Sequence, residues 1–170
     1  MANRNDLRFI KTEQLIQDTY LTLKQKSKAA VKVNQLCETA LINKTTFYAH
    51  YETMDALHEQ VCMNTIERIL DETPNIDRAF SDTRSFVNSL VNVLRTHHVL
   101  LNTLFEENQS QLINLIENSL MKRHLQKDDL KGKELEIVFA IGGAARLLIT
   151  GQTDDRIEKV VQLIQKVIKD

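Results

Sequence analysis

The stretch VKVNQLCETALINKTTFYAHYETMDAL, residues 31–57, decides the fold of this chain. The apolar residues of its first part recur at helical spacing and predict a short helix with one buried face; they are Val33, Leu36, Cys37 and Ala40. An apolar turn follows, after which the side-chain oxygen of Asn43 can cap a second helix. The stretch therefore predicts two short helices joined by a tight turn.

The second of these helices, expected at residues 44–51, has few apolar side chains and many hydrogen-bond donors. A short helix this polar gains little from burial, so its side chains are expected to meet a polar, anionic partner. A helix-turn-helix places such a helix in the major groove of DNA. The donors are Lys44, Thr45, Thr46, Tyr48 and His50.

The run Thr46-Phe47-Tyr48-x-His50-Tyr51, with Asp55-Ala56-Leu57 after it, resembles the recognition-helix signature of the TetR family of bacterial transcriptional repressors. The preceding run Val31-Lys32-Val33, with Leu36 and Ala40, is similar to the stretch before that signature. The two runs lie in about the first third of the chain. The resemblance implies a DNA-binding domain at residues 1–52, a connecting helix at 53–74 and an effector-binding and dimerisation domain at 75–170.

The resemblance also assigns roles within the expected DNA interface. Lys44, Thr45 and Ala49 are expected nearest the base edges, where lysine can donate to guanine and methyl groups can touch thymine. Residues expected at the phosphates lie on both helices, because free backbone N–H groups at a helix start also favour anions. These residues are Lys32, Asn34 or Gln35, Thr46, Tyr48 and His50. Asn43 belongs to the same DNA-binding set as the cap of the second helix, while Phe47 and Tyr51 are expected to point inward.

Three residues depart from the family pattern. Leu41 stands where a turn glycine is usual, so either this leucine adopts a left-handed conformation or the turn differs. Glu52 replaces a frequent proline, and Met54 replaces a lysine that commonly contacts phosphate. We therefore expect weaker phosphate anchoring at the start of the connecting helix.

Composition indicates an all-α fold. The chain has 170 residues, 42% of them hydrophobic and 26% charged, with only four glycines and one proline. So few helix breakers, together with a globular composition, favour helices throughout. Nine are expected, at about residues 8–26, 34–40, 44–51, 53–72, 81–97, 99–105, 110–125, 133–150 and 156–169.

Charge is distributed unevenly along the chain. Residues 1–50 contain eight Lys and Arg against four Asp and Glu, a net charge of +4. Residues 51–170 contain 14 Lys and Arg against 19 Asp and Glu, a net charge of −5. A basic N-terminal part is typical of a surface that faces phosphate, although solubility alone could produce the same division.

The C-terminal part is expected to enclose an effector cavity and to form a dimer. Candidate cavity residues are Met63, Ile66, Phe86, Leu90, His97, Leu101, Phe105, Leu112 and Phe139. The last two helices carry apolar seams and a Gly142–Ala145 run that permits close helix approach. Expected dimer-interface residues are Phe139, Gly142, Gly143, Arg146, Ile157, Val160, Val161, Ile164 and Ile168, and an ordinary intramolecular core is the alternative.

Motifs for other functions are missing from the sequence. No glycine-rich phosphate loop, nucleophile elbow or zinc-protease motif occurs, so we expect no enzyme activity and no cofactor. Asp55, His58 and Cys62 have metal-ligand chemistry on one helix face but lack a fourth ligand, so no metal site is predicted. With no signal peptide or membrane-spanning run, we expect a cytoplasmic protein.

The sequence thus predicts a homodimeric regulator, a repressor, that binds a near-palindromic double-stranded DNA operator and is released by an effector. One alternative keeps this fold but places control in a protein partner, as in the dihydroxyacetone-kinase regulators that resemble the family. The other is a helical enzyme, which the missing catalytic spacings disfavour.

Overall fold

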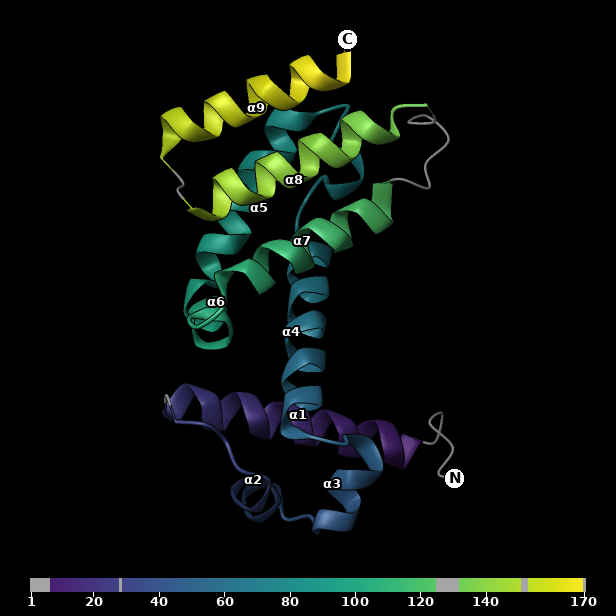
Figure 1. Ribbon diagram of the computed structural model, residues 1–170, viewed down its shortest axis with the longest axis vertical. Helices are drawn as coiled ribbons and strands as arrows, with labels where there is room; N and C mark the ends of the chain where they lie inside the picture. Colours follow the sequence, from purple (N-terminus) through teal and green to yellow (C-terminus); the bar gives the residue numbers. More distant parts are fainter. Residues whose placement is uncertain (1–6, 28, 125–131, 151–152, 170) are drawn as a thin grey trace. The chain divides into compact units, whose positions relative to one another are not determined.

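The computed structural model describes residues 7–27, 29–124, 132–150 and 153–169, which form an all-α fold (Figure 1). This part of the chain contains nine α-helices and one 3-10 helix, confirming the predicted class and helix number. The helices are α1 Leu7–Lys26, α2 Val33–Ala40, α3 Lys44–His50, α4 Met54–Asp71, η1 Ile76–Arg78, α5 Thr83–Thr96, α6 His98–Phe105, α7 Gln109–His124, α8 Glu134–Thr150 and α9 Asp154–Lys169.

The chain divides into two compact units, residues 1–64 and residues 65–170. The boundary falls inside α4, so this single helix contributes residues to both units. The sequence had suggested boundaries on either side of the connecting helix, at residues 52 and 74.

The first unit contains α1, α2, α3 and the beginning of α4, around a small apolar core. Four large side chains from these four helices are completely buried; they are Ile16, Leu36, Phe47 and Leu57. Each of the four helices thus contributes at least one side chain to the core of this unit, and α3 is held by its inner face through Phe47.

The turn between α2 and α3 depends on Leu41. This residue has φ 53° and ψ 41°, the left-handed conformation that was one of the two expectations for the missing glycine. With the chain reversed there, the backbone N–H of Ile42 donates to the Cys37 carbonyl oxygen at 3.0 Å, which closes the end of α2. The Leu41 side chain itself is 92% exposed, so packing does not offset the conformational cost.

The second unit contains the rest of α4 and the helices that follow it. In this unit α8 packs against both α7 and α9, and α9 also packs against α5. Gly142 of α8 faces α7 closely, because a Cβ atom there would lie 2.6 Å from Oε1 of Glu117. Within the described residues, no helix combines the length and apolar character needed to cross a membrane.

Candidate nucleic-acid interface and body pocket

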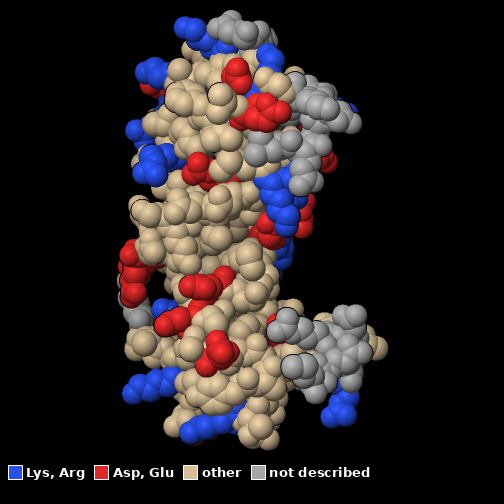
Figure 2. Space-filling view, turned by 45° about the vertical axis from the view of Figure 1, so that its right-hand side comes forward, with Lys and Arg blue, Asp and Glu red and all other residues tan. Residues whose placement is uncertain are grey.

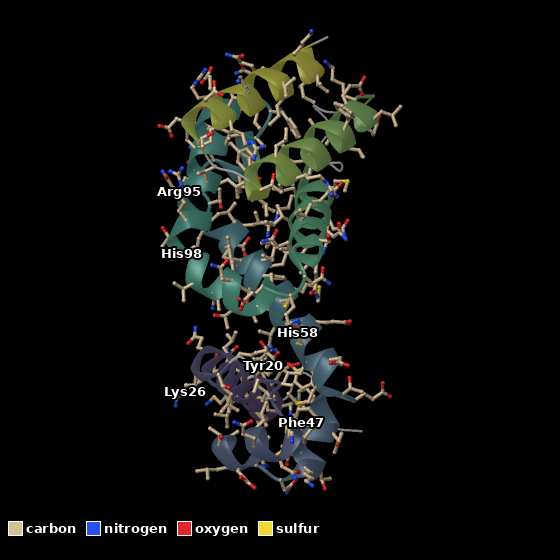
Figure 3. The ribbon with its side chains drawn as sticks, turned by 60° about the vertical axis from the view of Figure 1, so that its left-hand side comes forward. Tyr20, Lys26, Phe47, His58, Arg95 and His98 are labelled. Carbon is tan, nitrogen blue, oxygen red and sulfur yellow. The ribbon has the colours of Figure 1, made fainter. Side chains whose placement is uncertain are left out.

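Helix α3 is fixed at both ends. At its start, Oδ1 of Asn43 accepts hydrogen bonds from the Thr46 backbone N–H at 2.7 Å and from the Thr46 hydroxyl at 2.9 Å, as a predicted N-cap should. At its end, the Tyr51 N–H donates to the Phe47 carbonyl oxygen at 2.9 Å. The two aromatic side chains, Phe47 and Tyr51, point into the core as predicted, and Figure 3 shows Phe47 inside the first unit.

The outer face of α3 is polar and accessible. The side chains expected at base edges, Lys44, Thr45 and Ala49, are exposed, and Tyr48 is 55% exposed. Thr46 is half-buried because its hydroxyl takes part in the Asn43 cap. The residues expected to read DNA therefore share one open surface, which is the arrangement that a recognition helix requires.

His50 differs from its expected surroundings. Its ring stacks on Phe9 of α1, with centroids 3.8 Å apart and an interplanar angle of 26°. Burial lowers the pKa of His50, which the charge of Glu13 only partly opposes, so the neutral imidazole is favoured. A neutral His50 could donate one hydrogen bond to a phosphate oxygen but could not supply a positive charge.

Helix α2 contributes the two other expected contacts. Lys32 is the N-cap residue of α2, and both Lys32 and Asn34 are exposed. No side chain caps this helix start, so its first backbone N–H groups are available to an anion. On the face shown in Figure 2, lysine and arginine side chains lie at the end of the first unit that α2 and α3 form.

A partly buried polar network joins Tyr51, the residue that follows α3, to α1 and α4. Nε2 of Gln17 donates to the Tyr51 hydroxyl at 2.8 Å, and Nδ2 of Asn64 donates to Oε1 of Gln17 at 3.1 Å. The Tyr51 hydroxyl in turn donates to Oε1 of Glu13 at 3.3 Å. Sequence reasoning missed this network, although the i, i+4 spacing of Glu13 and Gln17 on the inner side of α1 was a detectable signal.

The Asp55, His58 and Cys62 set does not form a cluster. Nδ1 of His58 lies 2.8 Å from the Tyr20 hydroxyl (Figure 3) and contacts the Cys62 sulfur. Asp55, in contrast, is exposed. Burial raises the pKa of the Cys62 thiol to about 12, so the metal-binding thiolate is disfavoured. Among the described residues, no group of three or more His, Cys, Asp and Glu side chains could hold a metal ion.

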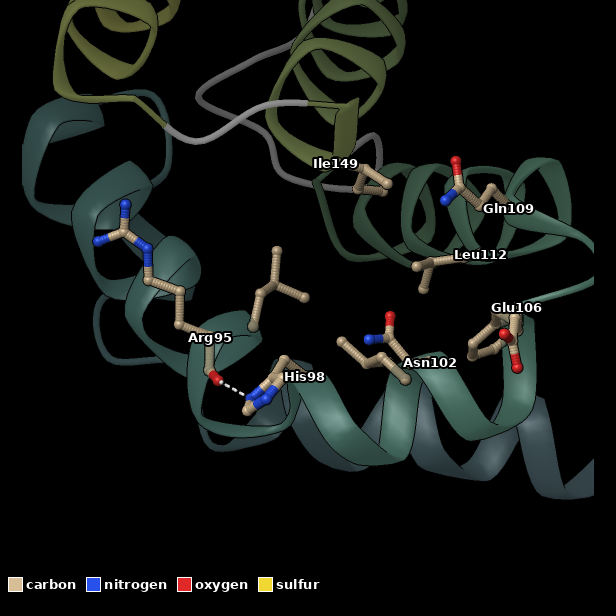
Figure 4. Close-up of a pocket in the computed structure, with 10 residues that line it drawn as sticks. Arg95, His98, Asn102, Glu106, Gln109, Leu112 and Ile149 are labelled. Carbon is tan, nitrogen blue, oxygen red and sulfur yellow. Dashed lines mark hydrogen bonds between the residues drawn. The ribbon is translucent and has the colours of Figure 1, made fainter. Parts of the chain in front are cut away.

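The second unit contains a pocket of about 370 Å³ at the junction of α5, α6, α7 and α8 (Figure 4). Three of the expected cavity residues line it: Leu101, Phe105 and Leu112. Its other lining residues are Leu94, Arg95, His98, Asn102, Glu106, Gln109 and Ile149. The sequence-based list contains none of these seven, although the His97-His98 pair was considered for a cavity, because no local pattern specifies where α5, α6, α7 and α8 meet.

The remaining cavity candidates lie elsewhere. Phe86 and Leu90 line a much smaller space of about 30 Å³. Ile66 is fully buried, and Nε2 of His97 lies 2.7 Å from Oε2 of Glu72. Met63 is 42% exposed in the first unit, and Phe139 is 71% exposed on α8.

The expected dimer residues fall into two groups. Those of α9 are mostly buried within the chain's own second unit; they are Ile157, Val160, Val161 and Ile164, while Ile168 is half-buried. Those of α8 are mostly exposed: Phe139, Gly143 and Arg146, with Gly142 half-buried against α7. An added Cβ at Gly143 would meet no atom within 4 Å, so this part of α8 is open.

A comparison of the sequence with protein-family models and with curated proteins found no match.

Proposed function

We propose that this chain is a homodimeric, sequence-specific DNA-binding regulator of the TetR type, acting in the cytoplasm as a repressor that an effector releases from its operator. The presentation of α3 carries the proposal. This helix buries Phe47 completely, is capped by Asn43, and leaves Lys44, Thr45 and Tyr48 accessible along its outer face. A short polar helix held rigidly from one side is suited to entering a major groove.

Two kinds of DNA contact are proposed for this surface. Lys44, Thr45 and Ala49 would read base edges, because their side chains are exposed on α3. Lys32 and Tyr48 would contact phosphate oxygens, which position the helix without reading sequence. The net charge of +4 over residues 1–50 supports attraction to the DNA backbone.

A two-fold dimer would place two copies of α3 on successive grooves of a near-palindromic site. The exposed apolar side chains of α8 support this part of the proposal, since Leu135 is 84% exposed, Phe139 71% and Leu147 36%. With Gly143 they share one side of the helix, and the glycine would let a second copy approach closely.

Regulation would act through α4. Arg123 of α7 contacts Asp71 at 2.7 Å and also pairs with Glu67, both residues of α4. The same helix, α7, begins with residues that line the 370 Å³ pocket. A ligand that favours one arrangement of α7 would thereby move α4, which continues into the DNA-binding unit. The fraction of dimers able to bind DNA would then change.

A second candidate function keeps DNA binding but assigns control to a protein partner. The observation that favours it is the same exposed face of α8, because Phe139 and Leu135 would suit a different protein as well as a second copy. Native mass spectrometry of the purified protein separates the two: a homodimer supports the first candidate, and a monomer that dimerises only with another protein supports the second.

The proposal is tested by selecting bound sequences from a pool of random DNA duplexes and measuring affinities for the selected operator. We expect Lys44→Ala to change which sequence is preferred, and Tyr48→Ala to weaken binding to all sequences to a similar extent. Lys166→Ala, an exposed lysine of α9, is the matched control and should leave binding unchanged. Equal affinity of the parent and both α3 variants for the selected operator would reject the assignment.

A further inference from the structure

The pocket of the second unit has two chemically different walls. Its floor is made of apolar side chains that are buried or half-buried: Leu94, Leu101, Phe105, Leu112 and Ile149. A volume of about 370 Å³ is in the size range of small-molecule sites. A compact apolar group, such as one ring, would therefore bury its surface against these side chains.

The other part of the lining is a row of exposed polar side chains. His98 and Asn102 of α6 and Glu106, the residue after that helix, follow one another at four-residue spacing, with Arg95 before them at the end of α5. Figure 4 shows Asn102 between His98 and Glu106, with Gln109 of α7 and Ile149 of α8 across the pocket. A ligand on the apolar floor would thus have one carboxamide on either side, Asn102 of α6 and Gln109 of α7.

The histidine of this row is oriented by the backbone. Nδ1 of His98 lies 2.9 Å from the carbonyl oxygen of Arg95, and because a carbonyl oxygen only accepts, Nδ1 is the donor. In the neutral ring Nε2 is then an acceptor, which a ligand N–H or O–H could satisfy. Together with the Asn102 and Gln109 amides, the pocket can both donate and accept.

The charges of the lining do not favour an ion. Arg95 and Glu106 carry opposite charges, so the lining has no net charge, and each already has an interaction partner within the protein. A charged ligand would lose hydration without gaining a dedicated counter-ion. A neutral group that both donates and accepts would lose much less.

We propose that this pocket binds an uncharged small molecule with one apolar face and a hydrogen-bonding head group such as a carboxamide or hydroxyl. Such a molecule is the class of effector to which the regulator would respond, so the inference rests on the proposed function. Its body would lie on Phe105 and Leu112, and its head group would contact Asn102 and Gln109.

The test uses three probes with the same ring and side-chain length but different charge: phenylacetamide, phenylacetate and 2-phenylethylammonium. Isothermal titration of the full chain without DNA should give saturable millimolar binding of phenylacetamide, about tenfold tighter than either ion. Asn102→Ala should weaken this binding about tenfold, whereas Asn114→Ala, an exposed asparagine of α7 outside the pocket, should not change it.

Tighter or equal binding of either ion would overturn the inference, as would unchanged affinity in Asn102→Ala or no saturable binding of any probe. Circular dichroism of both variants provides the check that the fold is retained. Because the titration contains no DNA, the two proposals fail separately. DNA binding without probe binding rejects only the pocket assignment, and probe binding without DNA binding rejects only the regulator.

Discussion

The side-chain amide of Gln17 donates a 2.8 Å hydrogen bond to the hydroxyl of Tyr51, which joins α1 to the residue that follows α3. Both side chains are buried, at 9% and 6% exposure. Tyr51→Phe would leave the Gln17 amide without this partner in a dry environment, so we expect the free energy of unfolding to fall by about 1 to 2 kcal/mol. Tyr48→Phe, at an exposed position of α3, is the control and should unfold like the parent in urea.

The same tyrosine gives a pH dependence. Burial, helped by the charge of Glu13, raises the pKa of Tyr51 from 10 to about 12 despite the hydrogen bond from Gln17. The unfolded chain therefore releases this proton at lower pH than the folded chain does. The resulting stabilisation is complete below pH 10 and is lost as pH rises through 12. The stability difference between parent and Tyr51→Phe should narrow over this window, and a constant difference would contradict the assignment.

The left-handed Leu41 predicts a stabilising substitution. Leu41→Gly would relieve the unfavourable contact of Cβ with the backbone at φ 53°, partly offset by the larger entropy of glycine in the unfolded chain. We expect the free energy of unfolding to rise by about 0.5 to 1 kcal/mol. As the control, Leu15→Gly at a half-exposed position within α1 should lower the free energy of unfolding, measured in urea, by about 1 kcal/mol. If both substitutions lowered the stability, or both raised it, this explanation would be refuted.

The features of α3 that could be predicted from sequence are those with local causes. The Asn43 cap and the inward Phe47 follow from side-chain chemistry and spacing within a few residues, and the structure has both. For Leu41 the sequence allowed two conformations, because a glycine position occupied by leucine can be strained or rebuilt. The stack of Phe9 on His50 joins residues 41 positions apart, so no local rule could have indicated it.

The second unit shows more clearly how far sequence patterns can predict contacts. The apolar stripe of α9 predicted a buried face, and Val160 and Val161 are buried, but within the chain's own unit. Periodicity identifies a face that avoids water and does not say whether the same chain or a second copy covers it. For the same reason Phe86 and Leu90 were expected in the large pocket, whereas the polar row around Asn102 was not.

Arg123 predicts a stability effect on the second unit. Burial by itself would raise the pKa of Glu67, but hydrogen bonds from Ser119 and Arg123 together with the Arg123 charge outweigh it and lower the pKa. Arg123→Ala removes this support and the contact with Asp71. We expect the free energy of unfolding to fall by only about 1 kcal/mol at neutral pH, because solvent screens the ion pair.

The pH dependence of that loss follows from the lowered pKa of Glu67. The stabilisation is present above its unfolded pKa of 4.5 and is lost as pH falls through the lower folded value. In urea, the free energy of unfolding of Arg123→Ala should therefore be lower than that of the parent at pH 7, and the difference should be much smaller at pH 3. Arg84→Ala breaks an exposed pair with Glu158 and serves as the control, for which no resolvable change is expected.

Phe139 predicts the effect of a charge on dimer formation. This side chain is 71% exposed beside open Gly143, so Phe139→Glu adds a carboxylate to the proposed contact without disturbing the subunit's own core. At a two-fold interface one substitution changes both copies, and the two carboxylates would be desolvated near each other. We expect sedimentation equilibrium to show a shift from dimer to monomer, with weaker operator binding. Val99→Glu, on a 61% exposed residue of α6, should remain dimeric, and an unchanged dimer in Phe139→Glu would place the interface elsewhere.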